Sequence, residues 1–481
     1  MGAVPAVLAG PRGGVVTGGR GSITNPNATT TLINQQSNRL TLDWSSFNVG
    51  KNETVDFAQP SSSAVALNDI LSQNPSKIFG RINANGRVVL INPNGILFGR
   101  TAQLNVGSLI ASSLELTGFD PVSGHFSFES LSGRAGLIDN EGTLRAAPGG
   151  SIALIGGTVL NNGLIVADMG SVGLGAGRVA TLDFYGGGLL RLEVSGDVEK
   201  NTAGKHAAVE NAGRIEAHGG QVLLTARATK DVFASAVNNT GIIRASRIEN
   251  VGGVIELSGP DGVVANSGTL DASGKGDDST GGTVEVTGQN VALTGGSRID
   301  ASGSAGGGTV FVGGGRHGAN PDVEDASSTY VGPDSTISAD ASSNGNGGNV
   351  TVWSNDGTQF NGKISARGSG SGNGGSAEVS GKASLDYQGT VDLRAPSGKT
   401  GTLLLDPDTV TLVHGTTDQN ISTSGSPPAD KSSGTQPSYL SDGTIDSQLA
   451  SANVTVSTST GDILISNTAG ATPGTVTIDP T

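Results

Sequence analysis

The residue types that most often perform catalysis or bind metals are sparse in this chain. It has no cysteine and five histidines, which do not repeat at the short spacings typical of metal ligands. We therefore expect each histidine to be a surface or loop residue, and we predict no metal site and no catalytic residue. The five are His125, His206, His218, His317 and His414.

Paired carboxylates are the other candidates for acid–base chemistry, as in enzymes that cleave polysaccharides. Here all three acidic pairs lie in predicted turns, where Asp commonly caps the backbone. Residues 370–375 match the G-x-G-x-x-G pattern, but no helix pattern follows them, and the Gly-rich stretches lack the recurring Asp of calcium-binding repeats. We predict no cofactor and no enzyme activity. The pairs are Asp277 and Asp278, Glu324 and Asp325, and Asp406 and Asp408.

Composition narrows the class of protein further. Of 481 residues 78 are glycine, only 4% are aromatic, and the net charge is −14. Acidic charge argues against nucleic acid as a partner, and the absence of cysteine excludes a disulfide scaffold. No apolar run approaches the ~20 residues of a membrane-spanning helix. Residues 1–10 lack the pattern of a signal peptide, so we expect a mature chain that begins at Met1.

A repeated pattern predicts the architecture. After about residue 138, two glycines are followed again and again by a short strand that alternates polar and apolar residues. Such short strands cannot bury an apolar face alone, but stacked in parallel they form a narrow aliphatic interior. The glycine-led strands are residues 149–154, 219–224, 252–257, 281–286, 307–312, 347–352 and 374–379.

The fold predicted from these repeats is all-β: a right-handed parallel β-helix, or solenoid, over residues 131–408. Ala and Val suit its thin interior, where Phe would not fit. The turn residues Asn140, Asn211, Asn239 and Asn266 are expected to stack as a hydrogen-bonded ladder. A β-sandwich is the alternative, but it does not explain the shared corner pattern.

Two segments interrupt the repeats. Residues 178–194 read as two strands around a Gly-rich turn, and we predict an extra-helical hairpin there. Residues 317–329 lengthen one repeat and contain Asn320-Pro321-Asp322, which is typical of a loop.

Residues 1–130 differ from the repeats in having bulkier side chains, including Trp44 and seven of the 11 phenylalanines. We expect this segment to cap the first coil, because an exposed strand edge invites association with other chains. Within it, residues 76–98 read as strand, turn, strand, turn, strand, with Pro93, Asn94 and Gly95 in the last turn.

The residue sequence of this last turn resembles a known motif. Asn92-Pro93-Asn94-Gly95-Ile96 resembles the NPNGI motif of two-partner secretion (TpsA-type) exoproteins, the filamentous haemagglutinin and high-molecular-weight adhesin family. Residues 18–23, 42–49, 74–78, 106–114 and 401–408 follow the layout of that family's secretion domain in order. Many haemagglutinin-type members carry an NPNL motif before NPNGI, and no equivalent precedes Asn92 here, which favours the adhesin subgroup.

The resemblance implies a function. It implies a haemagglutinin-type secretion domain in residues 1–130, exported through the periplasm by an outer-membrane TpsB (Omp85-type) partner with POTRA domains. The exoprotein would then fold at the bacterial surface. For Asn92, Pro93, Asn94, Gly95 and Ile96 two roles stay open: recognition by the partner, or a turn that nucleates the cap.

The C-terminal residues suggest that the chain is the start of a longer exoprotein. Residues 409–443 are a predicted Ser/Thr/Pro-rich linker, and 444–481 begin further repeats, with strands near 444–446, 453–456 and 461–465. The parent is interpreted as a monomeric adhesin that binds host or bacterial surface glycans or proteins. The alternatives are a contact-dependent inhibition toxin or haemolysin, and a β-helical polysaccharide-active enzyme.

Overall fold

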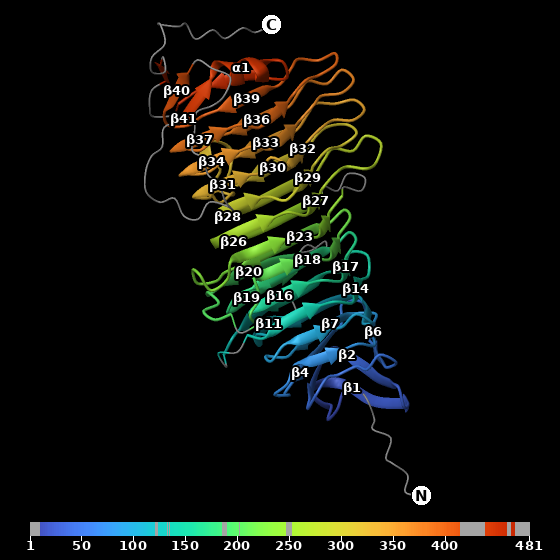
Figure 1. Ribbon diagram of the computed structural model, residues 1–481. Coiled ribbons are helices and arrows are strands. Elements are labelled where there is room, and N and C mark those ends of the chain that lie inside the picture. The colour runs from blue at the N-terminus through green and yellow to red at the C-terminus, as the bar shows by residue number, and fades with distance from the viewer. Residues whose placement is uncertain are drawn as a thin grey trace, which may run out of the picture. The chain divides into compact units, whose positions relative to one another are not determined.

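The regular secondary structure of the described residues is almost entirely β-strand (Figure 1). The chain divides into two compact units, Met1–Ala236 and Val237–Thr481. No helix among the described residues is long and apolar enough to cross a membrane. The computed structural model describes residues 10–120, 124–131, 133, 135–184, 190–201, 203–246, 253–413, 438–458 and 463–466.

The N-terminal unit opens with an antiparallel pair that leads into parallel coils. β1 (Val15–Asn27) runs antiparallel to β2 (Thr30–Trp44). β2 also pairs in parallel with β3 (Thr54–Ala58) and β4 (Val65–Ile70). β1 therefore covers the edge that the first coil would otherwise expose, which confirms the predicted cap.

Successive coils of this unit stack their strands into three parallel columns. The first continues from β3 through β6 (Arg81–Ala84), β9 (Gln103–Val106), β14 (Thr143–Ala146), β17 (Leu164–Val166) and β22 (Arg214–Glu216). The second continues from β4 through β7 (Arg87–Ile91), β10 (Ser108–Ser112), β15 (Ile152–Gly156), β18 (Ser171–Ala176) and β23 (Gln221–Ala226). The third comprises β5 (Ser76–Ile78), β8 (Ile96–Phe98), β13 (Leu137–Asn140), β16 (Thr158–Asn161) and β21 (Ala207–Asn211).

The parallel β-helix predicted from the repeats is thus confirmed, and its pairing already begins at β2 and β3. Residues 1–130 contain complete coils as well as the cap, because alternating apolar residues there are also buried in the interior. The boundary at residue 130 stays a prediction.

An antiparallel sheet lies outside the coils, as predicted for residues 178–194. β19 (Val179–Phe184) and β20 (Leu190–Ser195) pair antiparallel, and β11 (Glu115–Asp120) and β12 (His125–Glu129) extend them into a sheet in the order β11-β12-β19-β20. The apolar face of this sheet packs against outward-facing residues of the second column, so the unit has a second core. Members of that core are Ile110, Phe126, Phe128, Ile155, Leu182, Leu192 and Leu223.

The C-terminal unit repeats the three columns. One runs through β25 (Ile242–Arg244), β27 (Thr269–Asp271), β29 (Arg298–Asp300), β32 (Thr336–Ser338), β35 (Lys363–Ser365) and β38 (Thr390–Asp392). The second runs through β26 (Val254–Asn266), β28 (Thr283–Leu293), β30 (Thr309–Val312), β33 (Asn349–Val352), β36 (Ser376–Val379), β39 (Thr402–Leu405) and β42 (Asn453–Val456). The third starts from β24 (Ser235–Asn239) and the far ends of β26 and β28, then continues through β31 (Ser328–Val331), β34 (Gly357–Phe360) and β37 (Ser384–Tyr387).

One inward-facing register position of the third column holds Asn in some coils and an apolar residue in others. In the N-terminal unit Asn140 Nδ2 donates to Asn161 Oδ1, and Asn161 Nδ2 donates to Asn211 Oδ1, both at 2.7 Å. In the C-terminal unit Asn239 Nδ2 donates to Asn266 Oδ1 at 2.6 Å. These bonds confirm the predicted ladder.

Later coils carry apolar residues at the register position of Asn266: Leu293, Val331, Phe360 and Tyr387. Phe360 and Tyr387 are buried and their rings stack at 5.5 Å. The expectation that the interior excludes Phe is therefore wrong. Stacked rings fit because each aromatic residue faces another one coil away.

The glycine corners allow the coils to stack closely. A Cβ on Gly348 would lie 2.1 Å from Gly308 O, and that oxygen accepts the N–H of Asn349 at 2.9 Å. Gly282, Gly308, Gly375 and Gly401 meet the preceding corner in the same way. The second glycine of the repeat is required by this close contact between backbones.

Residues near the C-terminus depart from the predicted strands. The strand expected at 444–446 is wrong: these residues lie in α1 (Asp442–Leu449), because Ser441 caps the helix by accepting the N–H of Thr444 at 3.1 Å. β40 (Val410–Val413), β41 (Ser438–Ser441) and β43 (Ile463–Ser466) form a small parallel sheet. Most of the predicted linker, residues 414–437, lies outside the described residues.

Candidate functional site

The predicted secretion motif, Asn92 to Ile96, is the turn between β7 and β8. Asn92 is fully buried, and its Nδ2 donates to Asn74 O at 3.1 Å and to Ser76 Oγ at 3.0 Å. The Gly95 N–H donates to Asn92 O at 2.8 Å, which closes a β-turn. The Asn92 side chain thus fastens this turn to the preceding coil.

The remaining residues of the motif extend this connection. Asn94 donates its N–H to Asn92 Oδ1 at 3.0 Å and its Nδ2 to Ser72 O at 2.8 Å. Pro93 O accepts the N–H of Gly136, in the next coil, at 3.1 Å. Ile96 is buried in the interior.

Gly95 has the tightest position in the motif. It adopts a φ of +107°, and a Cβ on it would lie 2.5 Å from Leu137 O. The motif therefore joins three successive coils, and Asn92, Gly95 and Ile96 are inaccessible once these coils have formed.

A second arrangement of reactive residue types lies on the extra-helical sheet. His125 Nδ1 lies 2.5 Å from Asp183 Oδ1, and His125 Nε2 lies 2.9 Å from Ser127 Oγ. These contacts resemble a Ser-His-Asp triad, which also needs donors that bind the oxyanion. Ser127 lies on β12, whose backbone pairs with β11 on one side and β19 on the other. Ser127 is thus on a central strand of this sheet, where backbone N–H groups pair with neighbouring strands.

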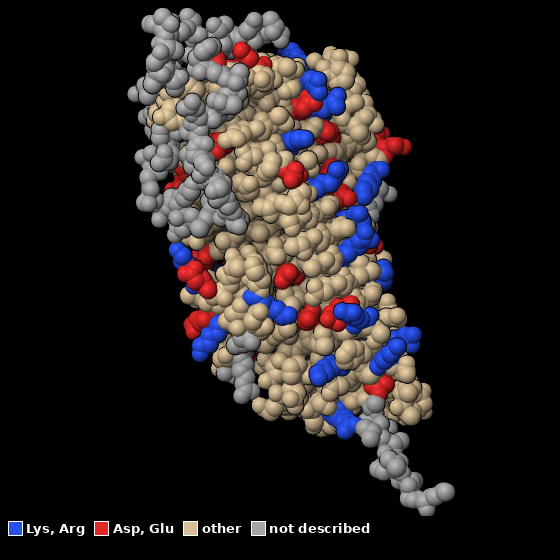
Figure 2. Space-filling view, viewed as in Figure 1, with Lys and Arg blue, Asp and Glu red and all other residues tan. Residues whose placement is uncertain are grey.

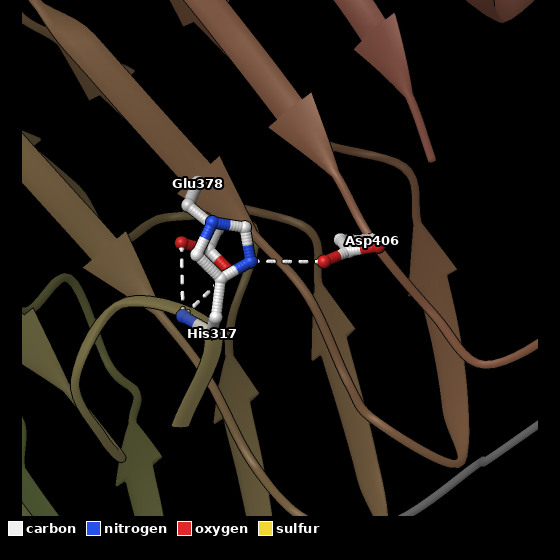
Figure 3. A group of neighbouring side chains, drawn as sticks. All are labelled: His317, Glu378 and Asp406. Atoms are coloured by element: carbon white, nitrogen blue, oxygen red, sulfur yellow. Dashed lines mark hydrogen bonds and ion pairs between the residues drawn. The ribbon is translucent and has the colours of Figure 1, made fainter. Parts of the chain in front are cut away.

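A third cluster joins His317, Glu378 and Asp406 in the C-terminal unit (Figure 3). His317 Nδ1 lies 2.9 Å from Asp406 Oδ2 and 3.8 Å from Glu378 Oε1, and the His317 N–H donates to both Glu378 oxygens at 3.1 and 3.3 Å. The carboxylates are 3% and 7% exposed, whereas the imidazole is 44% exposed. Burial raises the pKa of Glu378, and the charges of His317 and Arg316 oppose this rise.

The sequence interpretation missed this cluster. It treated His317 as an isolated loop residue and Asp406 as a turn residue, and it considered Glu378 only as part of a strand. His317 lies in the loop that lengthens one repeat, between β30 and β31. Glu378 is in β36 and Asp406 directly follows β39, so only the stacking of coils brings the three together. The cluster could have been found by aligning the repeats in register and placing the long loop over them.

The other candidate residues stay apart. His206 and His218 accept backbone hydrogen bonds through their carbonyl oxygens, and His414 lies outside the described residues. Asp278 is a turn residue with a φ of +61°. Residues 370–375 form a corner that leads into β36 and not into a helix.

Charged side chains are mixed by sign on the surface. Figure 2 shows Lys and Arg interspersed with Asp and Glu on the visible face. In the C-terminal unit Arg298 pairs with Asp300 at 2.9 Å, and Arg394 pairs with Asp392 at 2.6 Å. A surface of this kind differs from the clustered basic patch typical of phosphate-backbone binding.

A capped parallel β-helix with an extra-helical sheet and the Asn92–Ile96 turn defines a class of secretion domain. The TPS secretion domain family model matches residues 9–272, and the chain belongs to this family. It is therefore the secretion region of a TpsA-type exoprotein, which passes the outer membrane to the cell surface or extracellular space with the aid of a TpsB-type partner.

Known proteins support this assignment. The crystal structure of the HMW1 secretion domain from Haemophilus influenzae is similar, with a TM-score of 0.69 and 28% identity, covering 82% of this chain and 100% of that one. Two heme/hemopexin-binding proteins of H. influenzae are 28% and 29% identical over 47% and 52% of this chain. The matches cover 26% and 27% of those relatives, so the chain spans about a quarter of their length.

Proposed function

We propose that the POTRA domains of the TpsB-type partner bind an N-terminal segment that includes Asn92 to Ile96 before this segment folds. An extended chain can add a strand to an exposed sheet edge. The observation that supports binding before folding is the burial of Asn92 and Ile96 in the coil. Once the chain has emerged, the same residues would close the turn that joins three coils.

The test separates recognition from folding. Asn92→Ala is expected to weaken binding of the urea-unfolded chain to purified POTRA domains, and to slow refolding of the chain alone. Asn162→Ala is the matched control, because Asn162 is exposed and the substitution removes only a long side-chain bond to Asp139 at 3.3 Å and keeps the backbone bond to Asn140. If Asn92→Ala slows refolding but binds POTRA domains as the wild type does, the motif has only a structural role.

We propose that the parent exoprotein is a monomeric adhesin that binds surface glycans or proteins. The similarity to the HMW1 secretion domain supports the adhesin subgroup. The names of the heme/hemopexin-binding relatives favour a second candidate, capture of heme or hemopexin. Binding of the complete secreted exoprotein to host cells, and separately to hemopexin, distinguishes the two, because an adhesin retains cell binding when excess hemopexin is present.

We propose further that this region has no catalytic activity of its own. The family is a secretion domain family, and Ser127, which contacts His125 beside Asp183, lies on a central strand of the extra-helical sheet. Hydrolysis of activated esters and of polysaccharides by the purified chain should equal that of Ser127→Ala. A rate that this substitution lowers would contradict the proposal.

A further inference from the structure

We propose that His317, Glu378 and Asp406 bind one divalent transition-metal ion, of the Zn²⁺ type, that fastens the loop between β30 and β31 to the coils beneath it. The candidate ligand atoms are one imidazole nitrogen and two carboxylate oxygens, all within 4.8 Å of one another. Figure 3 shows the imidazole beside Glu378, with one ring nitrogen directed at Asp406.

The distances suit a shared ion after small movements. Ligand atoms bound to Zn²⁺ at ~2.0–2.2 Å in a tetrahedron lie about 3.3–3.6 Å apart. His317 Nδ1 lies 2.9 Å from Asp406 Oδ2 and 3.8 Å from Glu378 Oε1, on either side of that range. The three ligand atoms lie within 4.8 Å of one another, so binding requires the two carboxylates to draw together as well as a rotation of the half-exposed imidazole.

A neighbouring hydrogen bond already orients the Asp406 carboxylate. Ser457 Oγ donates to Asp406 Oδ1 at 2.8 Å, which leaves Oδ2 directed at His317. The Asp406 N–H donates to Ser380 Oγ at 3.1 Å. Partners that hold a ligand from behind are a regular feature of metal sites, because they fix its direction before the ion binds.

Charge favours a cation at this place. Glu378 and Asp406 are two buried carboxylates, and an ion of charge +2 would neutralise both. Arg316 is the competing cation, at 3.9 Å from Glu378 Oε2, but it is 61% exposed and can turn into solvent. Coordination through His317 Nδ1 moves the ring proton to Nε2, which also ends the 3.4 Å contact of Arg316 Nε with that nitrogen.

The donor set selects the kind of ion. Imidazole is a ligand for Zn²⁺ and its transition-metal neighbours, whereas Ca²⁺ and Mg²⁺ prefer sites built from oxygen alone. Three protein ligands leave a fourth position for water.

The site can exist only in the folded chain. The two carboxylates are 61 and 89 residues from His317 along the sequence, so an extended chain does not bring them together. The ion would therefore bind after the coils have stacked, and its binding energy would stabilise only the folded state. In an exported protein the ion would therefore stabilise the fold only after the chain has left the cell.

The experiment uses the complete 481-residue chain, freed of metal with a chelator and titrated with Zn²⁺ against a chromophoric competitor. We expect one Zn²⁺ per chain and a rise in the unfolding temperature, and no such rise with Ca²⁺ or Mg²⁺. His317→Ala, Glu378→Gln and Asp406→Asn should each weaken binding at least tenfold. His125→Ala is the matched control, because His125 pairs with Asp183 outside the cluster of His317, Glu378 and Asp406.

A second readout does not depend on stability. Trp353 packs against the same loop, since a Cβ on Gly318 would lie 2.7 Å from its Nε1. In a Trp44→Phe background Co²⁺ should quench Trp353 fluorescence, and Asp406→Asn, checked for folding by circular dichroism, should abolish the quenching. Binding that is absent from the folded wild type, or equally tight in the three ligand variants, would overturn the proposal.

Discussion

Buried polar residues in this protein are tolerated where stacked coils supply partners for them. Asn161 accepts from Asn140 and donates to Asn211, so its amide is used on both sides. The carboxyl group of Glu285 differs, because no hydrogen-bond donor or cation is among the groups that shift its pKa. Burial, together with the charges of Glu256 and Glu324, raises its pKa to about 7. We therefore expect substitution of Asn161 to destabilise the protein and substitution of Glu285 to stabilise it.

Asn161→Ala should destabilise the N-terminal unit. The substitution removes the acceptor of Asn140 and the donor to Asn211 in a buried position, at a cost of about 1–3 kcal/mol. Urea unfolding of the variant measures this cost. Asn162→Ala, at the adjacent exposed position, should leave stability nearly unchanged, and an equal loss in both variants would show that the ladder contributes nothing.

Glu285→Gln should stabilise the C-terminal unit at pH 8 but not at pH 4.5. The folded protein holds a proton on Glu285 more tightly than the unfolded chain does, so stability falls as the pH rises from about 4.5 to about 7. Glutamine removes this loss. Thermal unfolding of both proteins across this range measures the difference, and a gain in the variant that is the same at every pH would contradict the prediction.

The corner is the element that sets how closely coils can stack. Backbone of one coil meets the glycine of the next, as at Gly348 and Gly308. The sequence pattern of paired glycines predicted these corners, and the alternating strands predicted the inward-facing residues. What could not be predicted was the pairing of residues that lie in neighbouring coils but are well separated along the sequence, such as Phe360 with Tyr387.

Gly348→Ala should destabilise the C-terminal unit by about 1–3 kcal/mol, the usual cost of forcing extra atoms into a packed place. Its Cβ would lie 2.1 Å from a backbone oxygen, so the coils must shift apart. Gly276→Ala is the control, because a Cβ there meets no atom within 4 Å. Chemical denaturation compares the two. Equal midpoints would mean that the corners are not tightly stacked.

For the chain taken as one polypeptide, the sequence predicted the fold class, the cap, the extra-helical hairpin and the secretion family. It did not predict that β11 and β12 join the hairpin, because strand pairing across some 50 residues leaves no local pattern. It also did not predict the His317 cluster, whose members belong to different coils. The helix α1 was missed because Ser441 acts as a cap in a segment that otherwise alternates like a strand.

The central claim is that this chain carries the information for export by a TpsB-type partner. Its most direct test is the amount of chain outside the cell when it is produced with and without that partner, compared with a chain lacking residues 1–130. We expect secretion of the intact chain only with the partner, and retention of the shortened chain in the periplasm at a comparable total level. Undiminished delivery of the shortened chain, or delivery without the partner, would contradict the claim.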